Sequence, residues 1–398
     1  MPLNGIMEVI VNIIHIAKEL SKEMIENRRY IHKFPEINDE LPRTTKFVMD
    51  KLKEMGYEPR EICKSGVVAT VGNGGKTIML RADMDALPMK EESGLPFSSE
   101  NDNAHTCGHD IHTAMLLGAA RILKLVEKDL KGTVKLMFQP AEESVTGAKA
   151  MINAGLMENP KVDAAIAMHI NSADLPTGVV GYTIGETFAS ADKFRITVKG
   201  VGSHGAQPHN SADPINSAVH IHLALQELLS REVGPLENAV VTIGLFQAGT
   251  AGNAIPEMAV MEGTIRAYKK DIRDFILKRI EEISTLTARA FRTECEVDFY
   301  ASVPAIISEE NITKEFVGYI KGILGDKVVP YRKQMLSEDF SFVSDLVPSS
   351  YLALGAGSKE EGYKYGLHNP QIIFNEEAIH VGAAVFAECA IKYLENNQ

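Results

Sequence analysis

The chain has 398 residues, of which 45% are hydrophobic and 24% are charged. Because a single hydrophobic core rarely serves more than about 300 residues, we expect two domains. The 41 Lys and Arg residues against 53 Asp and Glu residues give a net charge of −12. A chain with this acidic excess has no basic surface with which to bind nucleic acid or an anionic membrane, so we expect neither partner. No apolar run approaches the roughly 20 residues that are needed to cross a bilayer.

The first apolar stretch, at 6–16, is interrupted by Asn12 and His15 and is followed by a charged run. This pattern predicts an amphipathic first helix and not a signal peptide. The four cysteines are scattered along the chain and form no disulfide framework. Together these features favour a cytoplasmic location.

Four short apolar runs are each followed by turn residues or a polar cluster, which suits strands that are buried on both faces of a sheet. They are Thr77–Leu80, Thr133–Phe138, Asp163–Met168 and Tyr351–Leu354. Between the first two runs, Ile111–Val126 is apolar on almost every side. It predicts a buried helix with Asp110 at the N-cap position. The expected domain is α/β, with a mixed, largely parallel sheet.

From about residue 188 the pattern changes to half-exposed strands that alternate with helices. The predicted elements are the strand Lys193–Lys199, the helix Pro214–Arg231, the strands Ala239–Phe246 and Met258–Tyr268, the helix Asp271–Phe291 and the strand Glu296–Ala301. Their β-α-β-β-α-β order predicts a ferredoxin-like domain inserted into the larger one. We therefore expect a discontinuous catalytic domain, 1–187 and 305–398, and an inserted domain, 188–304.

Polar residues follow the four predicted strands of the larger domain. Asp83 and Asp85 follow the first strand, Glu142 and Glu143 follow the second, His169 ends the third, and a loop after the fourth leads to His368. In open α/β sheets ligands bind outside the carboxyl ends of the strands, so we expect these side chains to share one crevice.

The segment HTCGHDIH at 105–112 lies where a loop enters the predicted helix. Cys107 and His109 are two residues apart, so both side chains can reach one point, and the helix N-terminus favours a thiolate there. The same residues also suit a buried, small hydrophobic Cys and a helix-capping His. Taken alone, the triplet leaves metal binding as one of two interpretations.

The combination of residues carries more weight than each residue by itself. Glu142 and Glu143 alone suit a solvated turn, and a lone His is usually structural. Five donors, however, exceed what one tetrahedral ion uses and suit two metal ions with a bridge. They are Cys107, His109, Glu143, His169 and His368. Two divalent cations would nearly balance the thiolate, both glutamates and a bridging hydroxide.

The remaining acidic and His residues near this set suit roles other than metal binding. In a hydrolytic metal site one of two adjacent carboxylates is a ligand and the other is the general base toward the metal-activated water. Asp85 suits a carboxylate that orients a ligand His without binding metal itself. The same supporting role also suits Asp110 and His112.

Short motifs spread over nearly the whole chain form a recognisable series. They are RRYIHKFPE at 28–36, LRADMDALP at 80–88, HTCGHDIH at 105–112, QPAEE at 139–143, AMH at 167–169, GAQPH at 205–209, NAIP at 253–256, GTIR at 263–266, SEDF at 337–340 and LHNP at 367–370. The series resembles the dinuclear-metal amidohydrolase and metallopeptidase family of aminoacylases, carboxypeptidases and hippurate hydrolases. Within that family it is most similar to the branch of auxin-conjugate (IAA-amino acid) hydrolases.

The resemblance implies that the five donors are the metal ligands and that Glu142 is the general base. It implies that the inserted domain is a lid and a dimerisation domain, with Asn253 and His204 reaching toward the substrate. Paired lids would present His204, which lies in a glycine-flanked loop, to the neighbour's active site. The chain departs from many members at Asp83, where they have a ligand His, so we expect His109 to supply that donor. Ala254 stands where the branch often has Val.

The predicted reaction is metal-dependent, deacetylase-like hydrolysis of the amide bond of an N-acyl amino acid. Glu142 takes the proton of the metal-activated water and passes it to the leaving amine. His204 stabilises the oxyanion, and Arg266 with Asn253 binds the amino-acid carboxylate. Arg266 equally suits an ion pair on the lid surface.

The predicted cofactors are two divalent metal ions per subunit, and the mixed sulfur, nitrogen and oxygen donors admit Zn, Mn, Co or Ni. The predicted assembly is a homodimer through the lid. One alternative is a dipeptidase or carboxypeptidase that acts on short peptides, because the scissile bond is the same amide. Another is a non-catalytic metal-dependent binding protein, which would have no need of a base such as Glu142.

Overall fold

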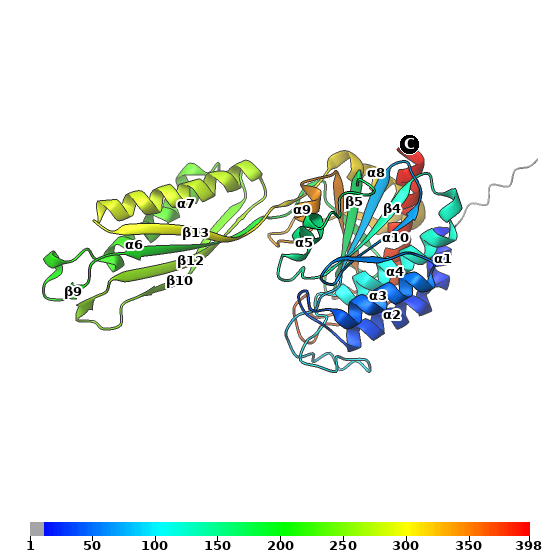
Figure 1. Cartoon of the computed structure of the whole chain (residues 1–398), viewed down its shortest axis with the longest axis horizontal. Coiled ribbons are helices and arrows are strands. Elements are labelled where there is room, and N and C mark those ends of the chain that lie inside the picture. Colours follow the sequence, from blue (N-terminus) through cyan, green and yellow to red (C-terminus); the bar gives the residue numbers. More distant parts are fainter. Residues whose placement is uncertain (1–11) are drawn as a thin grey trace, which may run out of the picture. The chain divides into compact units, whose positions relative to one another are not determined.

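The computed structural model describes residues 12–398, so residues 6–11 of the predicted first helix lie outside the described residues. The chain forms two compact units (Figure 1). The first comprises residues up to Gly185 with Ser308–Arg332 and Phe342–Gln398, and the second comprises Glu186–Ile307 with Lys333–Ser341.

A mixed sheet forms the centre of the first unit. Among the described residues its eight strands have the order β1-β2-β4-β3-β5-β16-β6-β15. Their bounds are β1 (Arg60–Cys63), β2 (Gly66–Gly72), β3 (Thr77–Asp83), β4 (Thr133–Gln139), β5 (Ala164–Asn171), β6 (Val180–Tyr182), β15 (Val328–Pro330) and β16 (Ser349–Gly355). The neighbours β4, β3, β5 and β16 run parallel, and β2 and β6 flank them antiparallel. The predicted α/β fold with a mixed, largely parallel sheet is confirmed.

The four parallel strands are the four apolar runs of the sequence. Every residue of β3, β4 and β16 is buried, which explains why these runs lack the alternation of a half-exposed strand. β5 continues beyond the predicted end at Met168 as far as Asn171. It does so because its backbone stays paired with β16, up to the pair of Asn171 with Gly355. His169 therefore lies within the strand and not after it.

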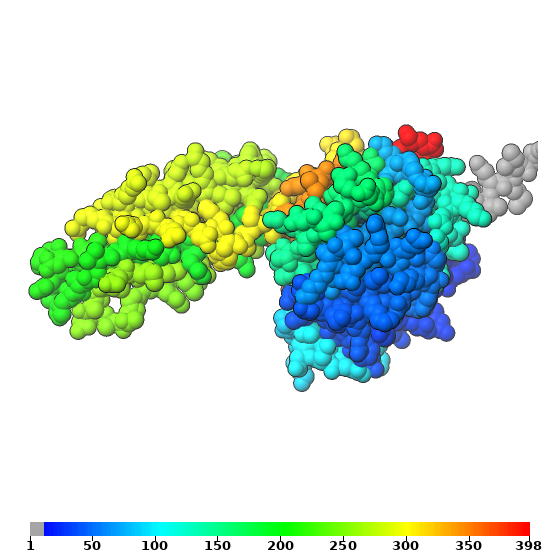
Figure 2. Space-filling model, viewed as in Figure 1, coloured from blue at the N-terminus to red at the C-terminus, as the bar shows by residue number. Residues whose placement is uncertain are grey.

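Helices pack against this sheet and share a core with residues of its strands. The α-helices on the segments of the first unit are α1 (Ile13–Glu19), α2 (Ser21–Lys33), α3 (Pro42–Glu54), α4 (His109–Leu125), α5 (Gly147–Asn153), α8 (Glu310–Leu324) and α10 (Ala378–Asn396), with short 3₁₀ turns η1 (Glu127–Asp129) and η4 (Gly325–Lys327). The short helix α9 (Ser341–Ser344) begins at the last residue of the second unit. A Cβ atom at Gly382 of α10 would lie 2.0 Å from the Sδ atom of Met115 in α4, so these two helices pack at close range. In Figure 2 the blue residues of the N-terminal helices form much of the visible face of this unit. None of the described helices has the length and apolar character needed to span a bilayer.

Helix α4 begins two residues earlier than the sequence predicts. Gly108 precedes it with φ +83°, a left-handed conformation that glycine adopts without strain, and the helix starts at His109. The predicted N-cap role of Asp110 is therefore wrong. Asp110 lies in the first turn, and its side chain contacts α2 instead of capping backbone N–H groups.

The second unit contains a four-stranded antiparallel sheet with the order β10-β12-β8-β13. In chain order its elements are β8 (Ala191–Lys199), α6 (Pro214–Glu227), the π-helical turn η3 (Leu228–Glu232), β10 (Ala239–Ala248), β12 (Met258–Ala267), α7 (Lys270–Ala290) and β13 (Glu294–Val303). Buried residues of α6 and α7 form one core with alternate residues of β8 and β12, so both helices cover one face of the sheet. Smaller elements are β7 (Gly185–Phe188), β9 (Ser203–His204), η2 (Pro208–Asn210), β11 (Ala254–Ile255) and β14 (Ile306–Ser308).

The second unit also takes in Lys333–Ser341, which the predicted division assigned to the larger domain. The reason is backbone pairing with β7. Gln334 N donates to Thr187 O at 2.9 Å, and Ala189 N donates to Gln334 O at 3.3 Å. The assignment of the two units as a catalytic domain and a lid stays a prediction.

Lys135 holds a loop of the first unit against β4 through a buried side chain. Only 2% of Lys135 is exposed, and its Nζ donates to the carbonyl oxygens of Leu156, Glu158 and Pro160 at 2.8, 2.9 and 2.7 Å. Burial lowers the pKa of Lys135 to about 8. The three acceptors have no comparable donor if this amine is removed.

We predict that Lys135→Met lowers the free energy of unfolding by about 1–3 kcal/mol, because it leaves buried carbonyl groups without a donor. Urea unfolding followed by circular dichroism measures this change. Lys131→Met is the matched control, since Lys131 lies four residues earlier and is exposed. Equal stabilities of the two variants would contradict the prediction.

Candidate metal centre

The carboxyl ends of the parallel strands bring the polar residues of the sequence to one edge of the sheet. β3 ends at Asp83, β4 ends at Gln139, and β5 carries His169 near its end. Because β3 lies between β4 and β5, Asp85 and Glu142, which follow β3 and β4, meet at this edge. This is the edge at which open α/β sheets bind their ligands.

The structure brings together all five predicted metal ligands and Glu142. Three overlapping groups have ligand atoms within 4.8 Å of one another: Cys107, His109 and His169; Cys107, Glu143 and His368; and His109, Glu142 and Glu143. Cys107 Sγ lies 3.4 Å from His169 Nε2, and His368 Nε2 lies 3.3 Å from Glu143 Oε1. We call these six residues the donor cluster.

Two of the His rings are fixed so that Nε2 faces the donor cluster. His109 Nδ1 donates to the backbone oxygen of Asp85 at 2.8 Å, and His169 Nδ1 donates to that of Ile170 at 2.7 Å. A carbonyl oxygen only accepts, so each neutral ring carries its proton on Nδ1 and its lone pair on Nε2. The Nε2 atom of His109 is buried without a hydrogen bond, which costs free energy that a bound cation would remove. The donor set therefore fits divalent metal ions.

Electrostatics in the donor cluster favour positive charge. Interactions with Cys107 and Glu143 raise the pKa of His368 to about 10. Burial opposes the charged form of His109, but Asp83 and Cys107 raise its pKa well above the ordinary value. Burial likewise opposes the charged form of Glu143, yet His368 and His109 lower its pKa. Anionic groups that stabilise protonated histidines in this way also suit metal cations.

Asp85 holds the backbone of the two glutamates. Its Oδ1 accepts from Glu142 N at 3.0 Å, and its Oδ2 accepts from Glu143 N at 3.1 Å. Ala141, with φ +54°, makes the turn that brings both N–H groups to this carboxylate. The hydrogen bond that orients His109 goes to the main-chain oxygen of Asp85, and the carboxylate of Asp85 lies 3.5 Å from His109 Nδ1. Asp85 thus supports both a histidine and the glutamate pair.

Asp83 and His112 form a second layer next to the donor cluster. Asp83 is buried and pairs with Arg81 at 2.7 Å, while His112 Nδ1 donates to Asp83 Oδ1 at 2.5 Å. His112 Nε2 accepts from Ile170 N at 2.8 Å, so this ring links the ends of β3 and β5. Asp83 Oδ2 lies 3.6 Å from His109 Nε2. The expectation that His109 replaces a ligand His at position 83 stays a prediction.

A further group of buried charges near Asp110 has no predicted role. Arg28 and His32, which belong to the motif at 28–36, contact Asp110 at 2.7 and 2.8 Å, and Glu91 contacts His32 at 3.0 Å. Their spacing of four residues on α2 was a local signal, because it places two basic side chains on one face of a helix. Their partners lie far away in the sequence and gave no signal.

The second unit brings His204 and Asn253 together. His204 does not lie in an irregular loop as predicted, because β9 pairs with β11 and sets Ala254 opposite His204. Gly205 N also donates to Asn253 O at 2.8 Å. The exposed ring of His204 accepts from Ala206 N through Nδ1 at 3.1 Å, which leaves the proton of the neutral ring on Nε2.

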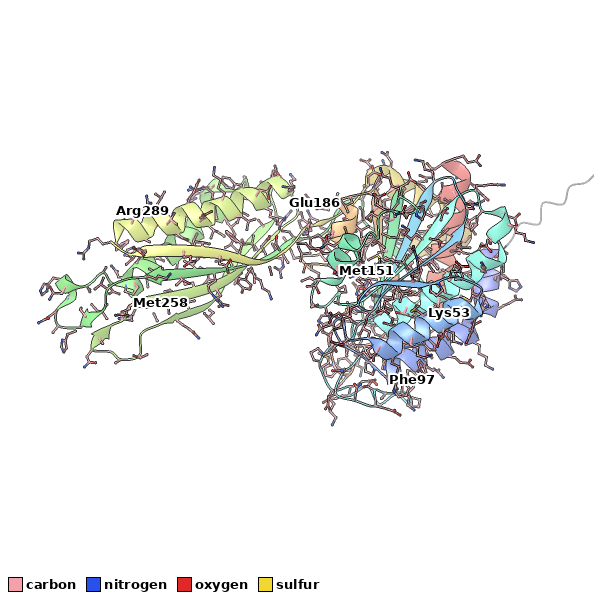
Figure 3. All side chains as sticks on the ribbon, in the orientation of Figure 1. Lys53, Phe97, Met151, Glu186, Met258 and Arg289 are labelled. Atoms are coloured by element: carbon pink, nitrogen blue, oxygen red, sulfur yellow. The ribbon has the colours of Figure 1, made fainter. Side chains whose placement is uncertain are left out.

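Arg266 lies far from this pair within the same unit. β12 begins at Met258, labelled in Figure 3, close to β11, and Arg266 is near its other end. Eight residues of strand span about 26 Å. Arg266 Nη1 donates to Ile265 O at 3.1 Å, burial lowers its pKa, and no ion pair of Arg266 is present among the described residues. The predicted pairing of Arg266 with Asn253 is not present within one unit.

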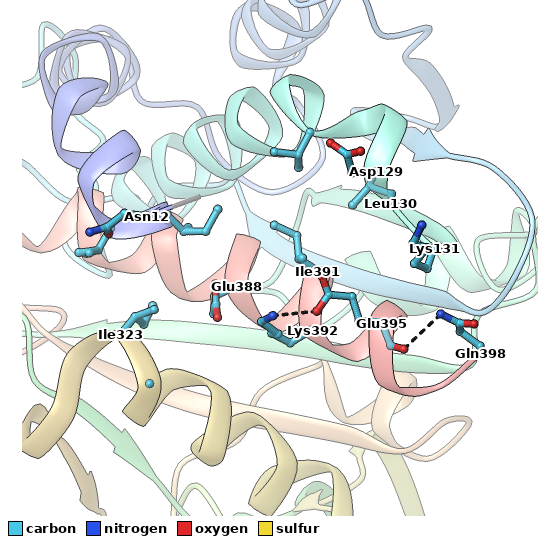
Figure 4. Close-up of a pocket in the computed structure, with 14 residues that line it drawn as sticks. Asn12, Asp129, Leu130, Lys131, Ile323, Glu388, Ile391, Lys392, Glu395 and Gln398 are labelled. Atoms are coloured by element: carbon cyan, nitrogen blue, oxygen red, sulfur yellow. Dashed lines mark hydrogen bonds and ion pairs between the residues drawn. The ribbon is translucent and has the colours of Figure 1, made fainter. Parts of the chain in front are cut away.

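A separate pocket of about 1050 Å³ lies on the first unit (Figure 4). Its lining includes Asp129 and Lys131, which precede β4, and Glu388 and Lys392 of α10. These residues lie at the amino end of β4, opposite the edge that carries the donor cluster. We therefore do not assign this pocket to the candidate site.

Comparison with known proteins places these observations in a family. Residues 79–392 match the model of peptidase family M20/M25/M40. The chain is 36% identical to the N-acetylcysteine deacetylase of Bacillus subtilis, over 95% of this chain and 98% of that protein. It is 37% identical to the hippurate hydrolase of Campylobacter jejuni, over 97% of this chain and 100% of that protein. A crystal structure of a dinuclear metal binding peptidase from the M20 family of B. subtilis matches with a TM-score of 0.83 and 33% identity, over 95% of this chain and 99% of that one. The chain belongs to peptidase family M20/M25/M40.

Proposed function

We propose that the protein hydrolyses the amide bond of N-acyl amino acids. The main support is the position of Glu142, a carboxylate that is 8% exposed and lies beside the predicted ligands. Its Oε2 is 3.8 Å from His109 Nε2. The names of the relatives, N-acetylcysteine deacetylase and hippurate hydrolase, point to the same class of substrate.

The five members of the donor cluster other than Glu142 are the proposed ligands of two divalent cations. The proposed cations are Zn, Mn, Co or Ni. When bound, such cations polarise the amide carbonyl and lower the pKa of a water molecule. Glu142 accepts the proton of the attacking water and donates it to the nitrogen of the leaving amine. Asp85 keeps Glu142 in place for both steps through its bond to the backbone N–H.

We propose that the second unit is a ferredoxin-like lid that forms a homodimer. Its sheet order and its two helices on one face support this description. Among the described residues β10 pairs with a strand on only one side. Ile215, Val219 and Leu223 are exposed at intervals of four residues on α6, and Phe246 is exposed on β10. An apolar stripe next to an open strand edge suits a second copy of the same surface.

Such a dimer would build each active site from two chains. His204 and Asn253 lie at the end of the sheet remote from Ala191 and Val303, where the chain enters and leaves it. We propose that they serve the partner's site, in which His204 Nε2 donates to the oxyanion. Arg266, about 26 Å away along β12, would then bind the substrate carboxylate in the site of its own chain. This arrangement explains why Asn253 and Arg266 lie apart in one unit.

There are two alternative functions: hydrolysis of short peptides at the same site, and metal-dependent binding without catalysis. A dipeptidase or carboxypeptidase cleaves the same kind of bond, and the family name and the M20 structure keep this alternative open. A non-catalytic binding protein is disfavoured because it needs no carboxylate in the position of Glu142. The four cysteines are free thiols, which suits the cytoplasmic location that we propose.

We predict that Glu142→Gln lowers kcat by at least about 100-fold, because the amide cannot accept the proton of the attacking water. Metal content, measured by mass spectrometry, should stay unchanged. Amine release from a panel of N-acetyl amino acids, N-benzoyl amino acids and dipeptides measures kcat and separates the amidohydrolase from the peptidase. Glu54→Gln on α3 is the exposed control. Normal turnover by Glu142→Gln would remove Glu142 as the base.

We predict that Cys107 is alkylated slowly in the metal-loaded protein and faster after chelation, because metal ligation shields a thiolate. Peptide mass spectrometry after a timed iodoacetamide pulse measures both states. Cys63 and Cys295, which are half-buried, serve as internal controls that chelation should leave unchanged. Equal labelling of Cys107 in both states would exclude it as a ligand.

We predict that co-expression of His204→Ala and Glu142→Gln chains restores activity that each homodimer lacks. A heterodimer has one site with both wild-type residues if His204 acts across the interface. Random pairing then gives about one quarter of wild-type activity. Amine release and native mass spectrometry measure activity and heterodimer content. Inactive heterodimers would show that His204 does not serve the partner's site.

A further inference from the structure

Helices α2 and α4 are joined by a network of buried charges behind the donor cluster. Arg28, 1% exposed, donates through Nε to Asp110 Oδ2 at 2.7 Å and through Nη1 to Glu376 Oε1 at 3.0 Å. His32, 4% exposed, has its Nδ1 atom 2.8 Å from the same Asp110 oxygen. Its Nε2 atom lies 3.0 Å from Glu91 Oε1.

The contacts of His32 define its charge. Both ring nitrogens face carboxylate oxygens, and an ionised carboxylate only accepts hydrogen bonds. Each nitrogen can therefore donate to a carboxylate. Burial and Arg28 oppose the charged form, but Asp110 and Glu91 raise the pKa of His32, which favours the imidazolium. Asp110 consequently accepts from two cationic side chains of α2 with a single oxygen atom. Charge-assisted bonds of this kind are among the stronger hydrogen bonds in proteins.

The network ends at the part of α4 that carries two predicted metal ligands. Asp110 directly follows His109 in the first turn of α4, and Cys107 precedes them across Gly108. On its other side this turn is held by the bond from His109 Nδ1 to the backbone of Asp85. Successive residues of a helix point about 100° apart, so Asp110 can face α2 while His109 faces the donor cluster.

We propose that Arg28 and His32 are positioning residues for the metal centre. By fixing Asp110 they fix the backbone from which the Cys107 and His109 side chains reach the metal ions. Stability alone does not explain these residues, because a buried ion pair is often no more stable than a well-packed apolar replacement. This inference rests on the proposed metal-dependent function, but it concerns metal affinity and geometry.

Arg29 provides a matched control within the same motif. It binds the same Glu376 carboxylate at 3.0 and 2.6 Å and lies 4.8 Å over the ring of Phe97, as Arg28 does. Phe97 is labelled in Figure 3. Arg29 makes no hydrogen bond to Asp110 among the described residues, and its side chain is 48% exposed. Arg29→Met therefore removes a guanidinium from the same Glu376 and Phe97 surroundings and leaves the contacts of Asp110 intact. Arg28→Met removes a buried guanidinium together with its contacts to Asp110 and His32.

The test is a titration of the metal-free protein with Co²⁺, followed by absorption of the Cys107 thiolate–cobalt band. We expect Arg28→Met and His32→Phe to weaken Co²⁺ binding by about ten- to a hundredfold and to alter the band, as loss of support for a ligand does elsewhere. Arg29→Met should match the wild type. Arg28→Met should add little to the effect of Asp110→Asn, because both changes break the same hydrogen bond between Arg28 and Asp110.

Urea unfolding of the metal-free proteins separates positioning from general damage. Wild-type Co²⁺ affinity in Arg28→Met and His32→Phe would overturn the inference, and so would an equal loss in Arg29→Met. Equal loss in Lys135→Met at matched stability would also overturn it, since the described hydrogen bonds of Lys135 go to the loop at 156–160 and not to residues 107–110. A wild-type protein without a thiolate band would overturn it together with the metal centre. Normal cobalt binding without amine release from any substrate would contradict only the proposed function.

Discussion

Parallel pairing of β4, β3, β5 and β16 is the constraint from which the candidate site follows. Parallel neighbours place their carboxyl ends at one edge, so the residues after each strand meet although they are far apart in the chain. Glu142 and Asp85 are 57 residues apart and hydrogen bond there. Both faces of these strands are covered, since every residue of β3, β4 and β16 is buried, and this explains the continuous apolar runs.

Backbone groups position several residues of the donor cluster. Main-chain oxygens of Asp85 and Ile170 set the rings of His109 and His169, and the N–H groups of Glu142 and Glu143 bind one carboxylate. Backbone donors and acceptors on a packed sheet move less than long side chains do. The geometry of the donor cluster therefore depends mainly on the fold and less on surface residues.

The sequence allowed the central strands to be predicted, because apolar runs leave local patterns. It also singled out the five donors and Glu142, which the structure brings together, while their roles in the site stay predictions. It misplaced the start of α4, since the left-handed Gly108 that starts the helix carries no hydrophobic signal. It also described His204 as lying in an irregular loop, because pairing with Ala254 over two residues is too short to show a period. The role of Arg28 was missed because its partner Asp110 lies 82 residues away.

The backbone contact between β7 and Gln334 affects how the second unit can be isolated. This unit is assembled from two separate stretches, Glu186–Ile307 and Lys333–Ser341. A recombinant fragment that ends at Ile307 would lose the groups that pair with Thr187 and Ala189. Swapping this unit between relatives, or expressing it alone, thus calls for a fusion that carries the short second stretch as well.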